Sequence, residues 1–395
     1  MQTGLWTADR EIGYSLRMMT SPVSSSQDFS TAPLVRVGIV GLGFMGRTHL
    51  ELYRRSGRAE VVAVADADPV RLRLDVSGAG GNLPLPPPSK DPAPFPEPRR
   101  FADGMALIRD AEVDLVDICL PLHLHKAFAR AALEAGRHVL CEKPLTRSVG
   151  DAEELFLLAA QRKRMLMNGL CLRFWPAYQW THAQWRRGEW GRRHQAFFKR
   201  LSPHPGAIGA GAWLTEDAKS GGALLEMHLH DIDQIRWLFG RPESVHCFGC
   251  RGVRSADCWD HVFTRYDFGD GSLVTAEGGW TAAGSMPFDM QFQIIADKAT
   301  VRFDGSAVTV YRDDGATTAD LSGFPQSTGW EGELHALLDA LQAGRSVPPV
   351  PPQEVLDGLC IAEAERLAAD SGAAVQVRYR ELPEFSETPS PGVTQ

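Results

Sequence analysis

The sequence of 395 residues lacks several features typical of membrane and nucleic-acid-binding proteins. No uninterrupted apolar stretch approaches the roughly 18 residues of a membrane-spanning helix, and residues 1–33 lack the apolar segment of a secretory signal. Basic blocks are also missing, and 49 acidic against 41 basic residues give a net charge of −8. This charge disfavours nucleic acid and anionic membranes as partners. We expect a cytoplasmic protein that binds a small molecule.

A cysteine framework is missing as well. Seven cysteines, an odd number spread from Cys119 to Cys360, show no disulfide pattern and fit a reducing compartment. Cys247 and Cys250 have the C-x-x-C spacing of a zinc site, but no second pair follows, and residues three apart on a strand face opposite sides. We predict that these thiols are buried and structural.

The length exceeds what one hydrophobic core usually serves, so two domains are expected. Residues 1–33 show no periodicity and predict a disordered leader. Residues 34–170 and 171–380 are predicted to form the two domains, and residues 381–395 a tail. Within residues 78–100, eight prolines fall between positions 84 and 98, which predicts a stiff surface insertion rather than a helix or central strand.

Residues 34–170 alternate short apolar runs with segments of helical spacing. We predict buried strands near 34–40, 61–65, 114–120 and 138–141, and helices over 47–58 and 124–135. Strands that alternate with helices imply right-handed crossovers and a parallel sheet. This half is therefore predicted to be a doubly wound α/β domain of the Rossmann type.

The second half changes character from about Cys171. Its β-rich runs cover residues 194–201, 244–253, 259–268, 272–280 and 288–296, with helices near 231–239 and 353–370. The segment Phe268-Gly-Asp-Gly271 lies between two of these runs and predicts a hairpin turn. We expect a large, mostly antiparallel sheet that carries a few helices and shapes a substrate pocket.

The segment Gly41-Leu-Gly43-Phe44-Met45-Gly46 is a G-x-G-x-x-G loop between a predicted strand and a predicted helix. Such a loop brings a pyrophosphate to a helix N-terminus, and Asp66 follows at the distance of an acid that binds ribose hydroxyls. Because a carboxylate there repels a 2′-phosphate, NAD is favoured over NADP, although Arg71 keeps NADP in consideration. A P-loop with Arg47 in place of its lysine is the less favoured alternative.

Three further segments carry a resemblance to a known family. They are Leu120-Pro-Leu-His-Leu-His125, Ala135-Gly-Arg-His-Val-Leu-Cys-Glu142-Lys143-Pro144 and Gly221-Gly-Ala-Leu-Leu-Glu226-Met-His-Leu-His230-Asp-Ile-Asp233. With the glycine loop they resemble the glucose-fructose oxidoreductase, inositol dehydrogenase and rhizopine catabolism (Gfo/Idh/MocA) family over residues 34–380. The resemblance implies a Rossmann domain, a C-terminal α/β domain with an open sheet, NAD or NADP as cofactor, and activity on hydroxyls of sugars and cyclitols. It also implies a homo-oligomer, dimer or tetramer, formed through that sheet.

The resemblance assigns roles to individual residues. Lys143 matches the family's substrate lysine, His230 its catalytic histidine and Glu226 the acid four positions earlier, where the family more often has aspartate. Arg173 matches an arginine that begins the second domain and is expected to face the substrate. The expected cofactor contacts besides Gly41, Gly43, Gly46 and Asp66 are Phe44, Met45, Leu120, Pro121, His125 beside the nicotinamide end, Glu142 and Lys143.

The chemistry of these residue types agrees with the resemblance. Oxidation of a secondary alcohol needs a base near neutral pH, and an imidazole such as that of His230 is the usual one. Glu226, one helical turn earlier, can reach the same face and orient the ring. Lys143 supplies a positive charge near the developing alkoxide.

Other interpretations remain open at this stage. Glu226 and His230 also fit a surface i,i+4 pair, and His228, His230, Asp231 and Asp233 together include metal-ligand types. A family member that retains its NAD and cleaves a glycosidic bond or epimerises a sugar by transient oxidation needs the same residues. A non-catalytic NAD-binding sensor, with Glu226 marking a decayed site, is a third possibility.

Overall fold

The computed structural model describes residues 33–74, 96–208, 211–324, 326 and 328–384. Contacts within the chain separate residues 1–33 from a compact unit over residues 34–395, and the description below concerns this unit. Almost all of the predicted leader, and most of the predicted proline-rich insertion and tail, lie outside the described residues.

A six-stranded parallel sheet forms the first half, in the order β3-β2-β1-β4-β5-β6. All five strand pairs are parallel, and most residues of the central strands are fully buried, which explains their continuous apolar sequences. This order is the doubly wound Rossmann arrangement expected from the sequence. The strands are β1 (Val35–Val40), β2 (Ala59–Ala65), β3 (Arg99–Phe101), β4 (Leu115–Ile118), β5 (His138–Glu142) and β6 (Leu166–Gly169).

Helices connect these strands, and their ends follow local sequence signals. Asp103 and Ser148 are N-caps whose side chains accept hydrogen bonds from the main-chain N–H of Met105 and Asp151. Gly136 has a φ of 73° just past the end of α4 (Leu122–Glu134), as its position in the sequence predicts. The helices are α2 (Phe44–Ser56), α3 (Gly104–Asp110), α4 (Leu122–Glu134) and α5 (Val149–Arg162), with a short 3-10 turn η2 (Arg71–Arg73).

The second sheet has nine strands in the order β14-β13-β12-β11-β7-β10-β9-β8-β15. Only β7 and β10 pair in parallel, so the sheet is mostly antiparallel as expected. The predicted turn at residues 268–271 joins two antiparallel neighbours, β9 and β10. The strands are β7 (Arg193–Pro203), β8 (Ser244–Arg251), β9 (Trp259–Asp267), β10 (Leu273–Ala282), β11 (Asp289–Ala296), β12 (Thr300–Phe303), β13 (Val308–Arg312), β14 (Gly315–Thr318) and β15 (Val375–Gln376).

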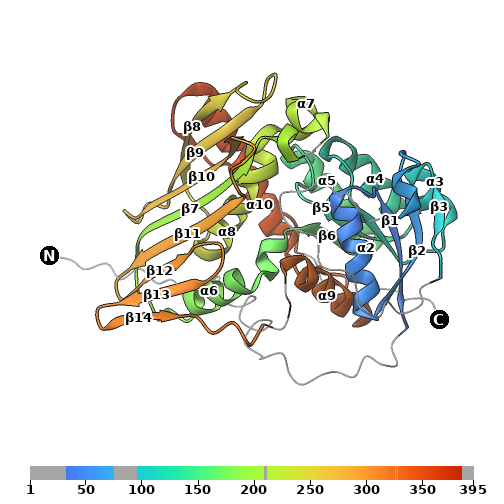
Figure 1. Cartoon of the computed structure of the whole chain (residues 1–395), viewed down its shortest axis with the longest axis horizontal. Coiled ribbons are helices and arrows are strands. Elements are labelled where there is room, and N and C mark those ends of the chain that lie inside the picture. The colour runs from blue at the N-terminus through green and yellow to red at the C-terminus, as the bar shows by residue number, and fades with distance from the viewer. Residues whose placement is uncertain (1–32, 75–95, 209–210, 325, 327, 385–395) are drawn as a thin grey trace. The chain divides into compact units, whose positions relative to one another are not determined.

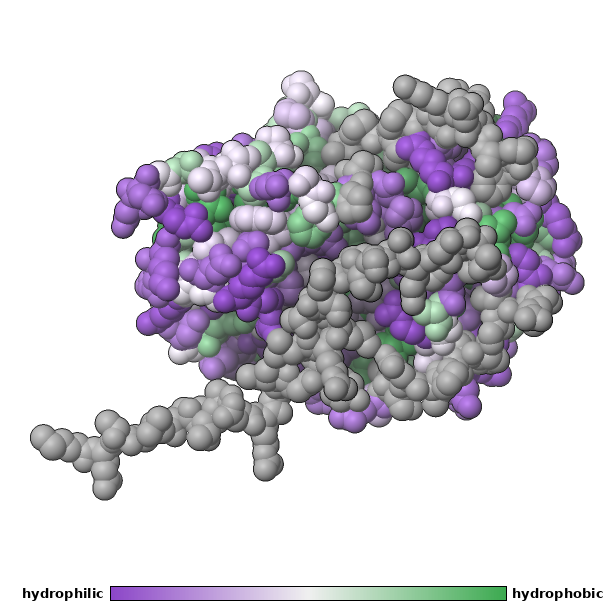
Figure 2. Space-filling view, turned by 90° about the horizontal axis from the view of Figure 1, so that it is seen from below, coloured by the Kyte–Doolittle hydropathy of each residue, from purple (hydrophilic) through white to green (hydrophobic). Residues whose placement is uncertain are grey.

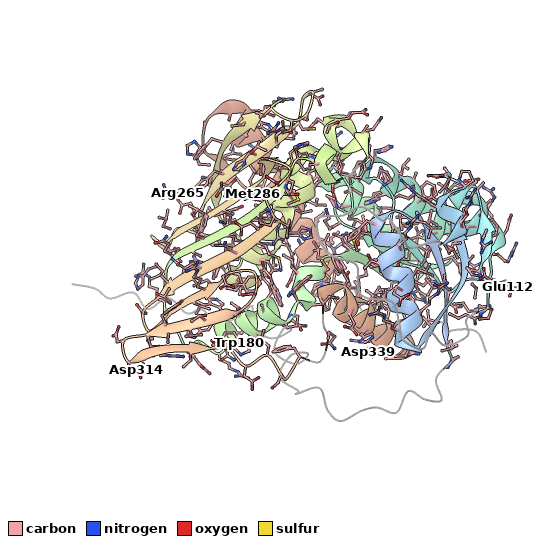
Figure 3. The ribbon with its side chains drawn as sticks, in the orientation of Figure 1. Glu112, Trp180, Arg265, Met286, Asp314 and Asp339 are labelled. Carbon is pink, nitrogen blue, oxygen red and sulfur yellow. The ribbon has the colours of Figure 1, made fainter. Side chains whose placement is uncertain are left out.

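Helices cover only one face of this sheet among the described residues (Figure 1). Alternate residues of β9 are buried against them, whereas Arg265 is exposed and lies on the outer side, opposite Trp180 of α6 (Figure 3). The helical elements of the second half are η3 (Cys171–Phe174), α6 (Pro176–Arg186), η4 (Pro205–Ile208), η5 (Ala212–Thr215), α7 (Asp217–Ser220), a π-helical turn η6 (Leu224–His228), α8 (Leu229–Phe239), α9 (Gly329–Gln342) and α10 (Pro352–Ser371).

Each sheet has its own hydrophobic core. Trp330, Leu334 and Leu337 of α9 belong to the core of the first sheet, although they follow the second sheet in the sequence. Trp175, Trp180 and Trp185 are partly buried against the core of the second sheet, where Trp190 is buried and contacts Trp180 and Trp185. The return of the chain from the second sheet to the first brings the two halves together around the candidate site.

None of the described helices is long and apolar enough to cross a membrane. On the face shown in Figure 2, polar residues surround separate hydrophobic patches. Cys247 is buried as predicted, but Cys250 is exposed, because residues three apart on a strand face opposite sides and Cys250 faces away from the core. The prediction of buried thiols was wrong for Cys250.

Candidate active site

The glycine loop lies between β1 and α2, at the carboxyl end of the parallel sheet. Gly41 has a φ of 94°, and a Cβ there would approach the carbonyl oxygen of Cys119 to 2.4 Å. A Cβ on Gly46 would lie 1.8 Å from the carbonyl oxygen of Gly41. Gly43 faces open space, with nothing within 4 Å of a Cβ. The loop therefore closes tightly on itself while leaving room above Gly43, which fits a pyrophosphate at the start of α2.

Asp66 follows β2 and holds this loop. Its Oδ2 accepts a hydrogen bond from the N–H of Leu42 at 2.7 Å, and its Oδ1 accepts one from the N–H of Asp68 at 2.8 Å. Arg71 lies 3.7 Å from Oδ2. The carboxylate thus stands beside the loop where ribose hydroxyls would reach it, and Arg47, the P-loop candidate, instead donates to the carbonyl of Leu42. The residues present fit an NAD molecule.

The other expected cofactor residues lie at the same end of the sheet. Phe44 and Met45 form the half-buried first turn of α2, and the ring of Phe44 packs edge-on against Trp330 of α9 at 6.1 Å. Leu120 and Pro121 are half-buried in the turn between β4 and α4. These residues border the crevice between β1 and β4, where the strand order reverses and dinucleotides bind in such folds.

Lys143 and Glu226 meet between the two halves of the chain. Lys143 Nζ donates to Glu226 Oε2 at 3.0 Å and to the carbonyl oxygen of Glu226 at 2.7 Å. The two side chains are only 15% and 10% exposed. Burial raises the pKa of Glu226, and the Lys143 ammonium opposes that shift. The Lys143–Pro144 peptide bond is cis.

Glu226 lies in the π-helical turn that precedes α8, and His230 lies in the first turn of that helix. Short π-helical segments occur frequently at functional sites. The expected contact between Glu226 and His230 is not present: Glu226 Oε1 and His230 Nδ1 have no hydrogen-bond partner among the described residues. The prediction that Glu226 orients His230 is therefore corrected, because the carboxylate is bonded to Lys143 instead.

His230 is kept neutral by its surroundings. Burial lowers its pKa well below the usual value, and the positive charges of Lys143 and Arg200 lower it further. The residue as a whole is half-buried, and its Nδ1 is buried without a hydrogen-bond partner among the described residues. A neutral imidazole carries a lone pair that can accept a proton.

His125 is almost fully buried, and both ring nitrogens face main-chain oxygens. Nδ1 lies 2.7 Å from the carbonyl oxygen of Pro144, and Nε2 lies 2.7 Å from that of Leu120. The ring thus has no free nitrogen for the cofactor contact that the sequence predicted.

Glu142 forms part of a buried polar cluster that sequence reasoning missed. Its Oε2 accepts from the N–H of Lys143 at 3.0 Å, and its Oε1 lies 3.5 Å from Nε2 of His49. His49 in turn bonds Asp117 at 2.8 Å. Burial alone would lower the pKa of His49, but the two carboxylates outweigh it and raise the pKa. The sequence did contain one signal for this cluster. Asp117 is an acid inside a predicted buried strand, and a buried acid needs a hydrogen-bonding or charged partner.

Glu333 of α9 extends this cluster from the other end of the sequence. It is fully buried, and neither carboxylate oxygen has a hydrogen-bond partner among the described residues. Burial, together with the charges of Glu142 and Asp117, raises its pKa well above the usual value. This shift favours the uncharged form of the Glu333 carboxyl group. No sequence motif marked this residue.

Arg173 has a different environment from the one expected. Its Nε lies 3.0 and 3.1 Å from the two oxygens of Asp233, its Nη2 lies 2.6 Å from Oδ1, and its Nη1 bonds Glu354. The residue is 5% exposed. Its guanidinium is occupied by these carboxylates, so Arg173 fastens η3 to α8 and α10 and does not offer a free donor to a substrate.

The residues that the sequence offered as possible metal ligands are engaged in other contacts. Asp231 forms a buried ion pair with Arg200 at 3.0 Å, Asp233 is held by Arg173, and His228 Nε2 faces Tyr266 at 3.1 Å. These side chains do not converge. In the described part of the chain, one group has ligand atoms close enough for a metal, His49 with Asp117 and Cys119, and its 2.8 Å contact is an ordinary hydrogen bond.

The family comparison agrees with this geometry. Residues 35–170 match the model of an oxidoreductase family with an NAD-binding Rossmann fold, and residues 178–302 match the GFO/IDH/MocA C-terminal domain. The chain belongs to the Gfo/Idh/MocA family. The resemblance, the fold class and the NAD cofactor expected from the sequence are thereby confirmed.

Individual relatives align over nearly their whole length. Inositol 2-dehydrogenase 1 of Saccharopolyspora erythraea is 28% identical over 371 residues, which cover 88% of this chain and 98% of that protein. The structure of a levoglucosan dehydrogenase with NADH and levoglucosan superposes with a TM-score of 0.74 at 20% identity, over 87% of this chain and all of that one. Apo scyllo-inositol dehydrogenase from Lactobacillus casei gives 0.69 at 23% identity, over 88% and 99%. At such identities the superpositions show a shared fold.

Proposed function

We propose that this member of the family is an NAD-dependent dehydrogenase that interconverts a secondary hydroxyl and a carbonyl on a sugar, cyclitol or related polyol. The observation that carries the proposal is the Lys143–Glu226 ion pair beside the neutral, half-buried His230, at the edge of an NAD-binding fold. The names of the inositol and levoglucosan dehydrogenases that resemble the chain support the substrate class.

The chain's own residues provide binding and proton transfer. NAD, when bound, supplies the hydride acceptor at its nicotinamide ring. Lys143 directs its ammonium at the substrate oxygen and stabilises negative charge as the hydroxyl loses its proton. His230 receives that proton, and its lowered pKa keeps the ring in its unprotonated form at neutral pH. Glu226 holds Lys143 in place from two atoms.

The charge balance favours an uncharged substrate. Lys143 is paired with Glu226, and the nearby Arg200 is paired with Asp231, so each positive charge has its own carboxylate. A substrate with a carboxylate or phosphate at this position would find no unpaired cation among these residues. The hydroxyl groups of a polyol can both donate and accept hydrogen bonds, so they suit a site in which each donor lies beside an acceptor.

The proposal is tested by a screen of neutral sugars and inositols with NAD and with NADP, followed by NADH absorbance at 340 nm. Sustained NADH formation with at least one polyol, lost in Lys143→Ala, is the expected result. An NAD-retaining lyase or epimerase would convert its substrate without net NADH, and a sensor would bind NAD without turnover. Either of these outcomes would replace the proposed reaction.

We also propose that the chain forms a homo-oligomer through the outer face of its second sheet. Phe197, Phe263 and Phe248 stack across this face, with centroid distances of 6.4 and 5.5 Å, and Phe248 is 55% exposed. Phe197 and Phe263 are half-buried, and a partly exposed aromatic stripe on a sheet face is typical of an interface. All seven cysteines are free thiols, which supports a reducing, cytoplasmic location.

A further inference from the structure

His125 connects two turns that leave the parallel sheet beside each other. It lies on α4, packed against β5, and is 1% exposed. The paired register of β4 and β5 ends at Ile118 and Cys141, so the ladder does not extend to the turns that follow. Beyond this point the imidazole stands between the carbonyl oxygens of Leu120 and Pro144, 2.7 Å from each.

The two carbonyls belong to segments with different tasks. Leu120 lies in the turn between β4 and α4 that borders the cofactor crevice, and Pro144 directly follows Lys143. A change in the separation of these turns therefore changes the position of Lys143 relative to the cofactor. Misplacement of a reacting group by about 1 Å costs on the order of a hundredfold in rate.

We infer that His125 is a positioning residue that sets the distance between the cofactor turn at Leu120 and the catalytic turn at Lys143. It acts through the two main-chain carbonyls and touches neither substrate nor cofactor. The inference rests on the proposed function for its kinetic consequences. Its structural consequences, an ordered pair of turns and a preserved cofactor site, are independent of the substrate.

The charge of the ring decides how many bonds it donates. A neutral imidazole has one N–H, and the second bond requires a proton on both nitrogens. Burial lowers the pKa of His125 to about 4 against the opposing effect of the two carbonyls, and the charges of Lys143 and His123 act in the same direction as burial. At neutral pH the ring therefore donates a hydrogen bond to one carbonyl oxygen, and its other nitrogen faces the second carbonyl oxygen without a proton to donate.

The test compares two substitutions with a matched control. His125→Phe keeps a ring but removes the donor, whereas His125→Gln keeps a donor. His138→Phe removes another buried histidine, at the amino end of β5, where Nδ1 accepts from the N–H of Met165. We expect His125→Phe to lower kcat about ten- to a hundredfold. We also expect it to weaken NADH binding several-fold, His125→Gln to recover most of both, and His138→Phe to change neither.

Hydrogen exchange gives a readout that needs no turnover. Amides of residues 119–124 and 143–147 should both exchange faster in His125→Phe than in the parent and in His138→Phe. Faster exchange in both segments supports the inference even if no polyol proves to be a substrate. Unchanged exchange in either segment, or an equal kcat loss in His138→Phe, would overturn it.

Discussion

Lys143 Nζ lies 3.0 Å from Glu226 Oε2 and 2.7 Å from the carbonyl oxygen of the same residue, across 83 positions of sequence. The contact joins the end of β5 in the first sheet to the π-helical turn before α8 in the second half. Both side chains are nearly buried, so the loss of one leaves the charge of the other without a counter-charge in a poorly solvated place. The position of Lys143 therefore depends on both halves of the chain.

Removal of either partner should impair chemistry more than cofactor binding. We expect Lys143→Ala to lower kcat by about 10²–10⁴, the range for a lost transition-state charge contact, with the Kd for NADH nearly unchanged. Glu226→Gln should cost more than Glu226→Asp, because the amide leaves the Lys143 ammonium without its counter-charge. Steady-state kinetics and NADH fluorescence titration measure both quantities.

The control for this prediction is Lys126→Ala. Lys126 is a partly exposed lysine on α4 that bonds Asp151 and Glu154 on the surface of the first domain. Its loss should leave kcat within about twofold of the parent, since surface ion pairs contribute little. A kcat for Lys143→Ala equal to that of Lys126→Ala would remove Lys143 from the mechanism.

The pH dependence of alcohol oxidation should report on His230. Its pKa is lowered by burial, Lys143 and Arg200, so the basic, neutral ring persists to pH values well below 6.5. We expect kcat/KM to fall only in this acidic range as the ring becomes protonated, and the His230→Ala variant, with kcat lowered about 10²–10⁴-fold, to lack this limb. A limb at or above pH 6.5 that persists in His230→Ala would assign it to another group.

The sequence was a good guide wherever a role follows from local spacing. The glycine loop, Asp66 and the alternation of strands and helices depend on neighbouring residues, and their predicted positions agree with the structure. The partner of Glu226 was predicted incorrectly, because an i,i+4 spacing indicates a shared helix face but not which remote residue competes for the carboxylate. The residue that bonds the carboxylate is Lys143, which directly follows β5 of the first sheet.

Arg173 and Glu333 illustrate the same limit. Arg173 was expected at the substrate, yet its guanidinium is held by Asp233 and Glu354, which are 60 and 181 positions away. Glu333 carried no motif and is buried only because α9 returns to the first core. Such contacts depend on tertiary packing, which local periodicity does not encode.

Cofactor preference should depend on Asp66. The carboxylate accepts from Leu42 and Asp68 and would repel a 2′-phosphate, so NAD should bind more tightly than NADP. Asp66→Ser should narrow the ratio of the two dissociation constants about tenfold or more, since removal of a charge contact is worth roughly 1.4 kcal/mol or more. Fluorescence titration of the parent and the variant with NADH and NADPH measures the ratio. Tighter binding of NADPH by the parent would contradict the assignment.

Self-association should depend on the aromatic stripe of the outer sheet face. Phe263 lies between Phe197 and Phe248, so Phe263→Glu places a charge in its centre. We expect a shift to monomer in light scattering after gel filtration, because burial of an unpaired charge opposes association. Leu157→Glu, an equally drastic change at an exposed leucine of α5, should leave the mass unchanged. A parent that is itself monomeric would refute the proposed interface.

His138 should make the protein less stable as the medium becomes acidic. Burial lowers its folded-state pKa to about 4, with Arg164 acting in the same direction, whereas the unfolded chain titrates near 6.5. Between these values the unfolded state binds a proton that the folded state does not, so stability is lost as the pH falls below 6.5. At pH 5 the loss is about 2 kcal/mol, from 1.4 kcal/mol for each pH unit. His138→Gln removes this titration. The free energy of unfolding of the parent, relative to the variant, should therefore drop by about 2 kcal/mol between pH 7.5 and pH 5 in urea denaturation, and a constant difference would show that His138 is protonated alike in both states.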